Sequence, residues 1–228
     1  MSTLRQFIGR IKLQLRGKTH IAGWNMTPEQ AVSFIRGRAK MVLTFYGYSG
    51  MGYEDEAAML QTAREVLSQY RPEKTLVVIG ATEVGIGAVY PLAKSMGFET
   101  AGIVTSEEAE DPEGLSSSVD HICFIKDNQH GGRLPHSNEL SPTSRAMVDC
   151  SDILIAIGGN DISRDELLEG KQQGKPVQFF PADMNHARAQ HQAKRKGLPV
   201  PDSFKGTAHD TLTGLKRSDL EERLKRNG

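Results

Sequence analysis

The sequence predicts an α/β fold built on an open, doubly wound parallel sheet with helices on both faces. Three observations support this prediction. From Lys40 onward, short apolar runs alternate with segments of helical periodicity, as in strands joined by crossover helices. Glycine-rich turns follow three of the apolar runs. The length of 228 residues, with 38% hydrophobic and 25% charged residues, suits one α/β domain with extensions at both ends.

The strands and helices of this domain can be assigned in order along the chain. The predicted strands are Met41 to Tyr46, Thr75 to Ile79, Glu99 to Val104, His121 to Ile125, Ile153 to Ile157 and Val177 to Phe180. The predicted helices between them are Glu54 to Gln69, Gly87 to Met96, Ser141 to Cys150 and Ser163 to Gln173. Right-handed crossovers between such strands give a Rossmann-like sheet, so residues 40–182 form the predicted central domain.

Residues 1–39 are predicted to form a helical extension. In Leu4 to Arg16 the apolar residues recur at intervals of four, three and four, which predicts a short amphipathic helix with a basic face. This helix would pack on the domain edge or on a second subunit, or would contact a membrane surface or an acidic partner. A second helix is predicted from Thr27 to about Gly37, because Thr27-Pro28-Glu29-Gln30 supplies an N-cap, a first-turn proline and a capping-box glutamine.

Residues 183–228 are predicted to form a basic, loop-rich C-terminal extension. The segment is polar, and prolines and glycines interrupt it after an initial helical stretch. Ser218 and Glu221 have the spacing of a capping box, which predicts a last helix over Asp219 to Lys225.

Composition and charge exclude several classes of protein. The 28 Lys and Arg residues balance 28 Asp and Glu residues, so the charge gives no indication of a nucleic-acid partner. No apolar run approaches the roughly 20 residues of a membrane span, and the basic N-terminal segment lacks the features of a secretory signal. Cys123 and Cys150 lack CxxC spacing and are expected to be core residues, which favours a reducing compartment. We therefore expect a cytoplasmic protein without a transmembrane segment.

Three glycine-rich turns form the candidate binding site. In open parallel sheets, ligands bind beyond the carboxyl ends of the strands, where these turns lie. Glycine lets the backbone approach an anion, and the free amides of a helix N-terminus donate to phosphate, as would the hydroxyls of Ser49, Thr82 and Ser163. We therefore expect a phosphate-bearing ligand where the turns converge. Their sequences are Gly47-Tyr48-Ser49-Gly50-Met51-Gly52, Gly80-Ala81-Thr82-Glu83-Val84-Gly85-Ile86-Gly87 and Gly158-Gly159-Asn160-Asp161-Ile162-Ser163.

Two common nucleotide-binding motifs are absent from these turns. The first turn has no lysine where a P-loop requires G-K-[ST]. Neither of the first two turns reproduces the G-x-G-x-x-G pattern of dinucleotide-binding proteins. A P-loop ATPase and a standard NAD dehydrogenase are therefore disfavoured.

Two segments resemble the SLOG superfamily of Rossmann-like nucleotide-binding proteins, and most of all its LOG-like branch. The stretch TLVVIGATEVGIGAVYPLAKSMGFETAGIV is similar to the LOG segment that contains a strand, a G-L-M-G turn, a helix and a strand. The stretch SRAMVDCSDILIAIGGNDISRDELLEGKQQGKPVQFF is similar to the segment around P-G-G-x-G-T-x-x-E. With MVLTFYGYSG as the first strand and turn, the resemblance covers about Met41 to Pro181. The superfamily also contains DprA-like and molybdenum-cofactor-carrier-like proteins.

The resemblance implies a function and residue roles. Members of the superfamily bind nucleotides or nucleotide-derived ligands, and the LOG branch hydrolyses the N-glycosidic bond of nucleoside monophosphates, usually as a dimer. In the P-G-G-x-G-T-x-x-E motif, Gly158 and Gly159 correspond to the paired glycines, Ser163 to the phosphate-holding threonine and Glu166 to the glutamate. In the G-L-M-G turn, Gly85 and Gly87 correspond to the two glycines around L-M.

The sequence also departs from the LOG pattern. Ile157 replaces the motif proline, and Asp161 stands near a position where glycine is usual. The arginine and lysine of the LOG M-x-x-R-K sequence correspond to Thr143 and Ser144. The nearby Arg145 is shifted by two residues, which turns a helical side chain by about 200°. Nucleotide binding is therefore better supported than phosphoribohydrolase chemistry.

Glu166 and Arg133 are the candidate catalytic residues. Glu166 would stabilise an oxocarbenium-like centre or activate water. Its spacing from Ser163 fits a helix capping box equally well, and Asp161 is expected to face a ribose hydroxyl. Arg133 lies in the long loop Lys126 to Leu140, where it would clamp an anion in place of the missing LOG arginine or remain a solvated loop residue.

Other side chains near the turns have two interpretations each. Tyr48 and Tyr53 would stack on a base or would pack in the core. His130, His136 and Glu139 would form an incomplete metal site, because no fourth ligand is identifiable.

The predicted function is binding of a nucleotide or nucleotide-derived ligand by a sensor or carrier. The alternative is a hydrolase that cleaves the N-glycosidic bond of a nucleoside monophosphate. The expected partners are a nucleotide-like small molecule and a second copy of the chain, and no cofactor or metal is predicted. The predicted ligand-binding residues are Gly47, Tyr48, Ser49, Gly50, Thr82, Gly85, Gly87, Gly158, Gly159, Asn160, Asp161 and Ser163.

Overall fold

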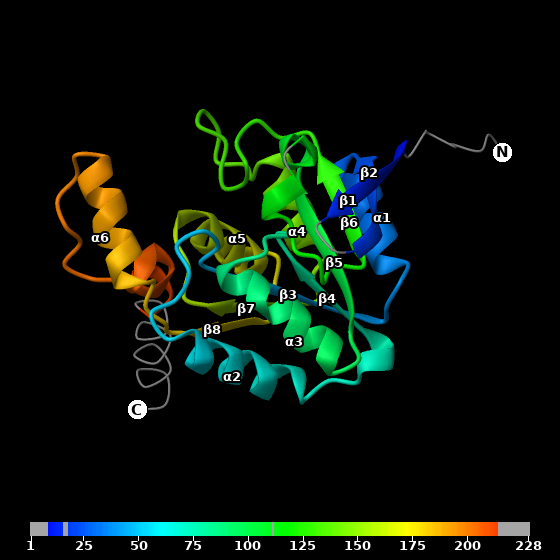
Figure 1. Cartoon of the computed structure of the whole chain (residues 1–228), viewed down its shortest axis with the longest axis horizontal. Helices are drawn as coiled ribbons and strands as arrows, with labels where there is room; N and C mark the ends of the chain where they lie inside the picture. Colours follow the sequence, from blue (N-terminus) through cyan, green and yellow to red (C-terminus); the bar gives the residue numbers. More distant parts are fainter. Residues whose placement is uncertain (1–8, 16–17, 111, 214–228) are drawn as a thin grey trace, which may run out of the picture.

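In the computed structural model, helices flank both faces of one sheet (Figure 1). The structure describes residues 9–15, 18–110 and 112–213. The strands are β1 (Gly9–Leu15), β2 (Lys18–Met26), β3 (Met41–Gly47), β4 (Thr75–Ile79), β5 (Glu99–Thr105), β6 (His121–Ile125), β7 (Ile153–Ile157) and β8 (Val177–Phe180). The helices are α1 (Pro28–Arg36), α2 (Glu56–Leu67), α3 (Val89–Ser95), α4 (Pro142–Cys150), α5 (Asp161–Gln172) and α6 (His186–Arg195), and residues 206–213 are also helical.

The strand order of the sheet is β1-β2-β6-β5-β4-β3-β7-β8. Every neighbouring pair is parallel except the hairpin β1–β2. From β3 the chain proceeds through β4 and β5 to β6, and then returns across the sheet to β7 and β8 on the other side of β3. The order therefore reverses between β3 and β7, and the predicted Rossmann-like sheet is confirmed.

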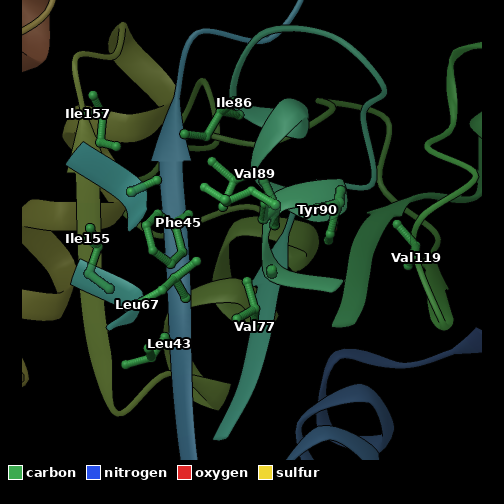
Figure 2. Close-up of a cluster of buried hydrophobic side chains, with 14 of the residues drawn as sticks. Leu43, Phe45, Leu67, Val77, Ile86, Val89, Tyr90, Val119, Ile155 and Ile157 are labelled. Atoms are coloured by element: carbon green, nitrogen blue, oxygen red, sulfur yellow. The ribbon is translucent and has the colours of Figure 1, made fainter. Parts of the chain in front are cut away.

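Strand β3 is buried on both faces because its side chains alternate between two hydrophobic cores. Leu43 and Phe45 belong to the core on the side of α2 and α3, where they pack with residues such as Leu67 and Tyr90 (Figure 2). Val42 and Tyr46 belong to the opposite core, which contains residues of α1, α4, α5 and the helical stretch 206–213. The near-continuous apolar strands of the sequence follow from burial on both faces.

Helix α1 begins and ends as predicted. The Thr27 hydroxyl accepts from the backbone of Gln30 at 3.3 Å, and the Gln30 side chain accepts from the backbone of Thr27 at 2.9 Å, which completes a capping box. Pro28 occupies the first turn, and Gly37 is the C-cap. Local sequence is sufficient for this prediction because all the groups involved lie within one turn of a helix end.

The predicted helix Leu4 to Arg16 is wrong for Gly9 to Leu15; its other residues lie outside the described part of the chain. Residues Gly9–Leu15 form strand β1, which pairs with the unpredicted strand β2, and β2 in turn pairs with β6. Residues 1–39 are therefore not a purely helical extension, because two of their segments extend the sheet. In the sequence Arg10-Ile11-Lys12-Leu13-Gln14-Leu15, polar and apolar residues alternate, and this period of two is the strand signal that the helical spacing obscured.

The C-terminal segment lies at the end of the sheet opposite the β1–β2 hairpin (Figure 1). After β8, Asp183 accepts from the backbone of Glu54 at 3.1 Å, and the backbone of Asn185 donates to Gly52 at 3.2 Å. These bonds fasten the start of α6 to the loop after β3. The predicted helix Asp219 to Lys225 lies outside the described residues. Within the described ranges, no helix combines the length and apolar character needed to cross a membrane.

Candidate functional site

A cavity of about 1170 Å³ opens at the carboxyl edge of the sheet, where the strand order reverses. The turn after β3 and the start of α5 after β7 line it, as do the carboxyl ends of β4 and β5. Pockets for drug-sized ligands measure about 300–1,000 Å³. The cavity is therefore large enough for a ligand of nucleotide size, and it lies where open α/β sheets bind their ligands.

Most of the predicted ligand-binding residues line this cavity. They come from the turn after β3, the turn after β4 and the first turns of α5. Ser49, Thr82 and Ser163, the predicted hydroxyl donors, therefore share one cavity. The predicted residues in the lining are Gly47, Tyr48, Ser49, Gly50, Thr82, Asn160, Asp161, Ser163 and Glu166.

Gly85, Gly87, Gly158 and Gly159 are not part of the cavity lining. Gly85 has a φ of +64°, and a Cβ at this position would overlap the backbone oxygen of Tyr48. Gly158 has a φ of +63°, and a Cβ there would lie 2.5 Å from the Tyr48 ring. These glycines let neighbouring segments approach one another, so they shape the turns without facing the cavity.

The start of α5 presents free backbone donors to the cavity. The helix begins at Asp161, two residues before the predicted start at Ser163. Asn160 is its N-cap, but the Asn160 side chain makes no hydrogen bond to the helix end. The first amides of a helix have no acceptor within the helix, so an anionic ligand in the cavity would find donors here. The carboxylate of Asp161 is offset by Arg164, at 2.8 Å.

Glu166 is a buried carboxyl in the cavity lining, with 4% of its surface exposed. Ser144 of α4 donates to Oε1 of Glu166 at 2.5 Å and accepts from the backbone of Gly132 at 2.7 Å. Burial raises the pKa of Glu166 to about 8, so its protonated form dominates at neutral pH. The capping-box interpretation is wrong, because Ser163 lies inside the helix and Glu166 bonds to α4.

Arg133 is not part of the cavity lining. Its guanidinium donates to the backbone oxygen of Asn138 and lies 3.4 Å from the carboxylate of Glu169 on α5. Arg145 is about half exposed and pairs with Glu139 at 3.5 Å. Neither arginine therefore occupies the place of the missing LOG arginine, and the catalytic role of Arg133 stays a prediction that no contact with the cavity supports.

The histidines of the long loop do not form a metal site. His130 lines the cavity and pairs with Glu107 at 3.2 Å, whereas Glu139 pairs with Arg145. Throughout the part of the chain that the structure describes, no three His, Cys, Asp or Glu side chains lie close enough together to hold a metal ion. His130, His136 and Glu139 therefore do not converge.

Tyr48 and Tyr53 pack against each other below the first turn, with ring centroids 5.2 Å apart. Both are buried, with 2% and 5% of their surfaces exposed. The Tyr48 hydroxyl donates to the backbone of Ala182 at 3.1 Å, and the Tyr53 hydroxyl donates to that of Ile157 at 2.7 Å. These contacts favour the packing interpretation over stacking on a base.

Two residues of the cavity lining carry buried hydroxyls that the sequence did not single out as donors. The hydroxyls of Tyr46 at the end of β3 and Thr143 on α4 are buried, and neither makes a hydrogen bond with a described residue. Buried polar groups are normally hydrogen-bonded. Ser151 lies near the hydroxyl of Tyr46 and Asp127 lies near that of Thr143, so both buried oxygens have polar neighbours within the protein.

Helix α6 contributes cavity residues that the sequence reasoning missed. Arg188, His191 and Arg195 line the cavity together with Ala187 and Gln192. The three basic residues follow one another at intervals of three and four, which places them on one face of the helix. That spacing was visible in the sequence, but only the tertiary structure brings this face to the turn after β3.

The fold and the cavity define a Rossmann-like α/β protein with a candidate ligand site at the topological switch point of its sheet. No protein-family model and no curated protein sequence matches the chain. Several solved structures are similar to it at low sequence identity.

Three of these structures are representative. The molybdenum cofactor binding protein from the phototrophic bacterium Rippkaea orientalis is 18% identical over 79% of this chain and 98% of that chain, with a TM-score of 0.46. The Moco carrier protein from Chlamydomonas reinhardtii is 17% identical over 78% and 99%, with a TM-score of 0.45. DNA processing protein A (DprA) from Streptococcus pneumoniae is 13% identical over 79% and 62%, with a TM-score of 0.43. At these identities the comparison concerns the fold alone.

Proposed function

We propose that the protein binds a nucleotide or nucleotide-derived ligand in the cavity at the carboxyl edge of the sheet and acts as a sensor or carrier of that ligand. The observation that carries the proposal is the convergence of Ser49, Thr82 and Ser163 on one nucleotide-sized cavity. The phosphate would lie between the turn after β3 and the start of α5, where backbone amides and hydroxyls supply donors.

The remainder of the cavity suits the uncharged part of such a ligand. Ile79, Ile86, Ile103 and Met147 contribute apolar surface to the lining. A mostly apolar pocket with a few polar groups is the usual design of a small-molecule site.

Calorimetric titration with nucleoside monophosphates tests the proposal. Ser163→Ala removes a hydroxyl from the phosphate end of the cavity, and we expect it to weaken nucleotide binding about fivefold to tenfold, the effect of one hydrogen bond to a charged group. Ser68→Ala removes an exposed hydroxyl at the end of α2 and is the matched control. Absence of binding to every nucleotide at millimolar concentration, or equal effects of the two substitutions, would contradict the proposal.

A hydrolase is the second candidate, and the buried carboxyl of Glu166 in the cavity lining is the observation that favours it. With a pKa of about 8, Glu166 carries a proton at neutral pH. It would donate this proton to the departing base while the oxygen of a water molecule bonds to C1′ of the ribose and the N-glycosidic bond breaks; the carboxylate that remains would take up the proton that the water releases. Glu166 would act as a general acid in this reaction, because a protonated carboxyl cannot act as the base.

Chromatographic detection of free base separates the two candidate functions. A hydrolase releases base from a nucleoside monophosphate, and Glu166→Gln abolishes that release while leaving nucleotide binding measurable. A sensor or carrier binds the nucleotide without turnover. Base release that persists in Glu166→Gln would exclude Glu166 as the acid. Association with a second copy of the chain and a cytoplasmic location stay predictions.

A further inference from the structure

The outer wall of the cavity is the basic face of α6. Arg188, His191 and Arg195 are exposed on this face, whereas Ala189 and Ala193 are buried on the other side of the helix. The helix therefore packs through its two alanines and leaves its basic side chains to the cavity.

This wall has a defined position relative to the proposed phosphate site. The backbone of His186 donates to the carboxylate of Glu54 at 2.9 Å, and the backbone of Asn185 donates to Gly52 at 3.2 Å. Nη1 of Arg188 lies 3.4 Å from the backbone oxygen of Gly50. The first turn of α6 is thus fastened to the loop after β3, and Arg188 is placed beside the turn that would hold a phosphate.

The charges that line the cavity are distributed unevenly. Arg188 and Arg195 form no ion pair with a carboxylate among the described side chains, whereas Asp161 is paired with Arg164. Glu166 is protonated at neutral pH because burial raises its pKa to about 8. Positive charge therefore remains on the α6 side. Another acidic residue of the lining, Glu108, lies in the segment that follows β5.

The basic face is longer than a single phosphate group. Arg188 and Arg195 are seven residues apart, a rise of about 10 Å along a helix. One phosphate bound at the turn after β3 would contact Arg188 and leave Arg195 without an anion. A second phosphate linked to the first would extend along the helix towards Arg195.

From this geometry we infer that the ligand is a nucleotide with two linked phosphates, a pyrophosphate group, and that α6 binds the second phosphate through Arg195 and His191. The inference rests on the proposed function, because it takes the turn after β3 and the start of α5 as the site of the first phosphate. Two sources share this chemistry: a nucleoside diphosphate, and a nucleotide whose pyrophosphate is esterified at both ends.

Titrations of the full chain with AMP, ADP and ADP-ribose at one ionic strength test the inference. We expect ADP, ADP-ribose or both to bind at least about tenfold more tightly than AMP, and Arg195→Gln to remove that advantage while changing AMP binding less than about twofold. Lys194→Gln is the matched control, because Lys194 is an exposed cation of the same helix outside the cavity lining and its loss changes the net charge equally.

The outcomes distinguish this inference from the proposed function. Tighter binding of ADP alone identifies a terminal pyrophosphate, and tighter binding of ADP-ribose identifies one esterified at both ends. Equal affinities for AMP, ADP and ADP-ribose, or equal effects of Arg195→Gln and Lys194→Gln, overturn the inference while AMP binding still supports the proposed function. If none of the three nucleotides binds, the proposed function itself fails.

Discussion

Replacement of Glu166 by glutamine tests the electrostatics of the cavity in a way that needs no ligand. Burial raises the pKa of Glu166 from its ordinary value of 4.5 to about 8; Ser144 lowers it in part, and the nearby Asp165 raises it. Between these two values the folded protein binds more protons than the unfolded chain. The free energy of unfolding therefore falls as the pH rises. The stabilising contribution of the protonated carboxyl is fully present below pH 4.5 and is lost as the pH rises through 8.

The size of this effect follows from the shift in pKa. One pKa unit corresponds to about 1.4 kcal/mol, so the full shift corresponds to about 5 kcal/mol, of which about 2–3 kcal/mol falls between pH 6 and 9. Glutamine has the shape of the protonated carboxyl and keeps an oxygen for the bond from Ser144, but it does not ionise. We therefore expect the unmodified protein to lose about 2–3 kcal/mol more of its unfolding free energy than Glu166→Gln does when the pH rises from 6 to 9.

Urea denaturation followed by circular dichroism from pH 6 to pH 9 measures this difference. Glu65→Gln, which replaces an exposed carboxyl on α2, is the control and is expected to follow the pH dependence of the unmodified protein. If Glu166→Gln shows the same pH dependence as the unmodified protein, Glu166 ionises normally. The general-acid role and the charge distribution inferred for the cavity would then both be wrong.

Two further substitutions test how the loops around the cavity are held. Gly85→Ala is expected to lose at least about 1–2 kcal/mol of stability, because alanine is strained at a φ of +64° and its Cβ would overlap the backbone of Tyr48. Gly80→Ala, where a Cβ would meet no atom within 4 Å, is the control, and equal melting temperatures for the two variants would contradict the close approach. Tyr48→Phe removes the hydrogen bonds from the Tyr48 hydroxyl to the backbone of Ala182 at 3.1 Å and of Phe204 at 3.4 Å, and the second of these bonds tethers residues 198–213. We expect the variant to lose about 1 kcal/mol of stability and to be cleaved faster within residues 198–213. The control is Tyr70→Phe, because Tyr70 is a half-buried tyrosine whose hydroxyl makes no hydrogen bond to a described residue. Unchanged cleavage in Tyr48→Phe would show that the Tyr48 hydroxyl does not hold residues 198–213 in place.

The parts of the fold that the sequence predicted correctly depend on local patterns. The strands of the central domain end within one residue of their predicted limits, because residues buried on both faces form continuous apolar runs. The start of α1 was predicted because Thr27 and Gln30 lie within one turn of each other. The cavity lies at the predicted edge because parallel strands share one carboxyl edge, whatever their order in the sheet.

The errors arise where distant segments decide the outcome. Gly9–Leu15 is a strand because it pairs with β2, and β2 is a strand because it pairs with β6, about 100 residues further along the chain. Gly85 and Gly158 were expected to face a ligand, but both allow close packing around Tyr48. Arg133 bonds to Glu169 and to its own loop, so no contact with the cavity supports its predicted catalytic role, which stays a prediction.

By itself, the sequence determined that this chain forms a parallel α/β sheet with small hydroxyl residues at the ends of its strands, because periodicity and turn chemistry act over a few residues. The tertiary structure alone decided that α6 brings Arg188 and Arg195 to the same cavity and that burial keeps Glu166 protonated. The physical reason is that the position of a charge and the solvent around it depend on every segment packed nearby, and these segments are far apart in the sequence.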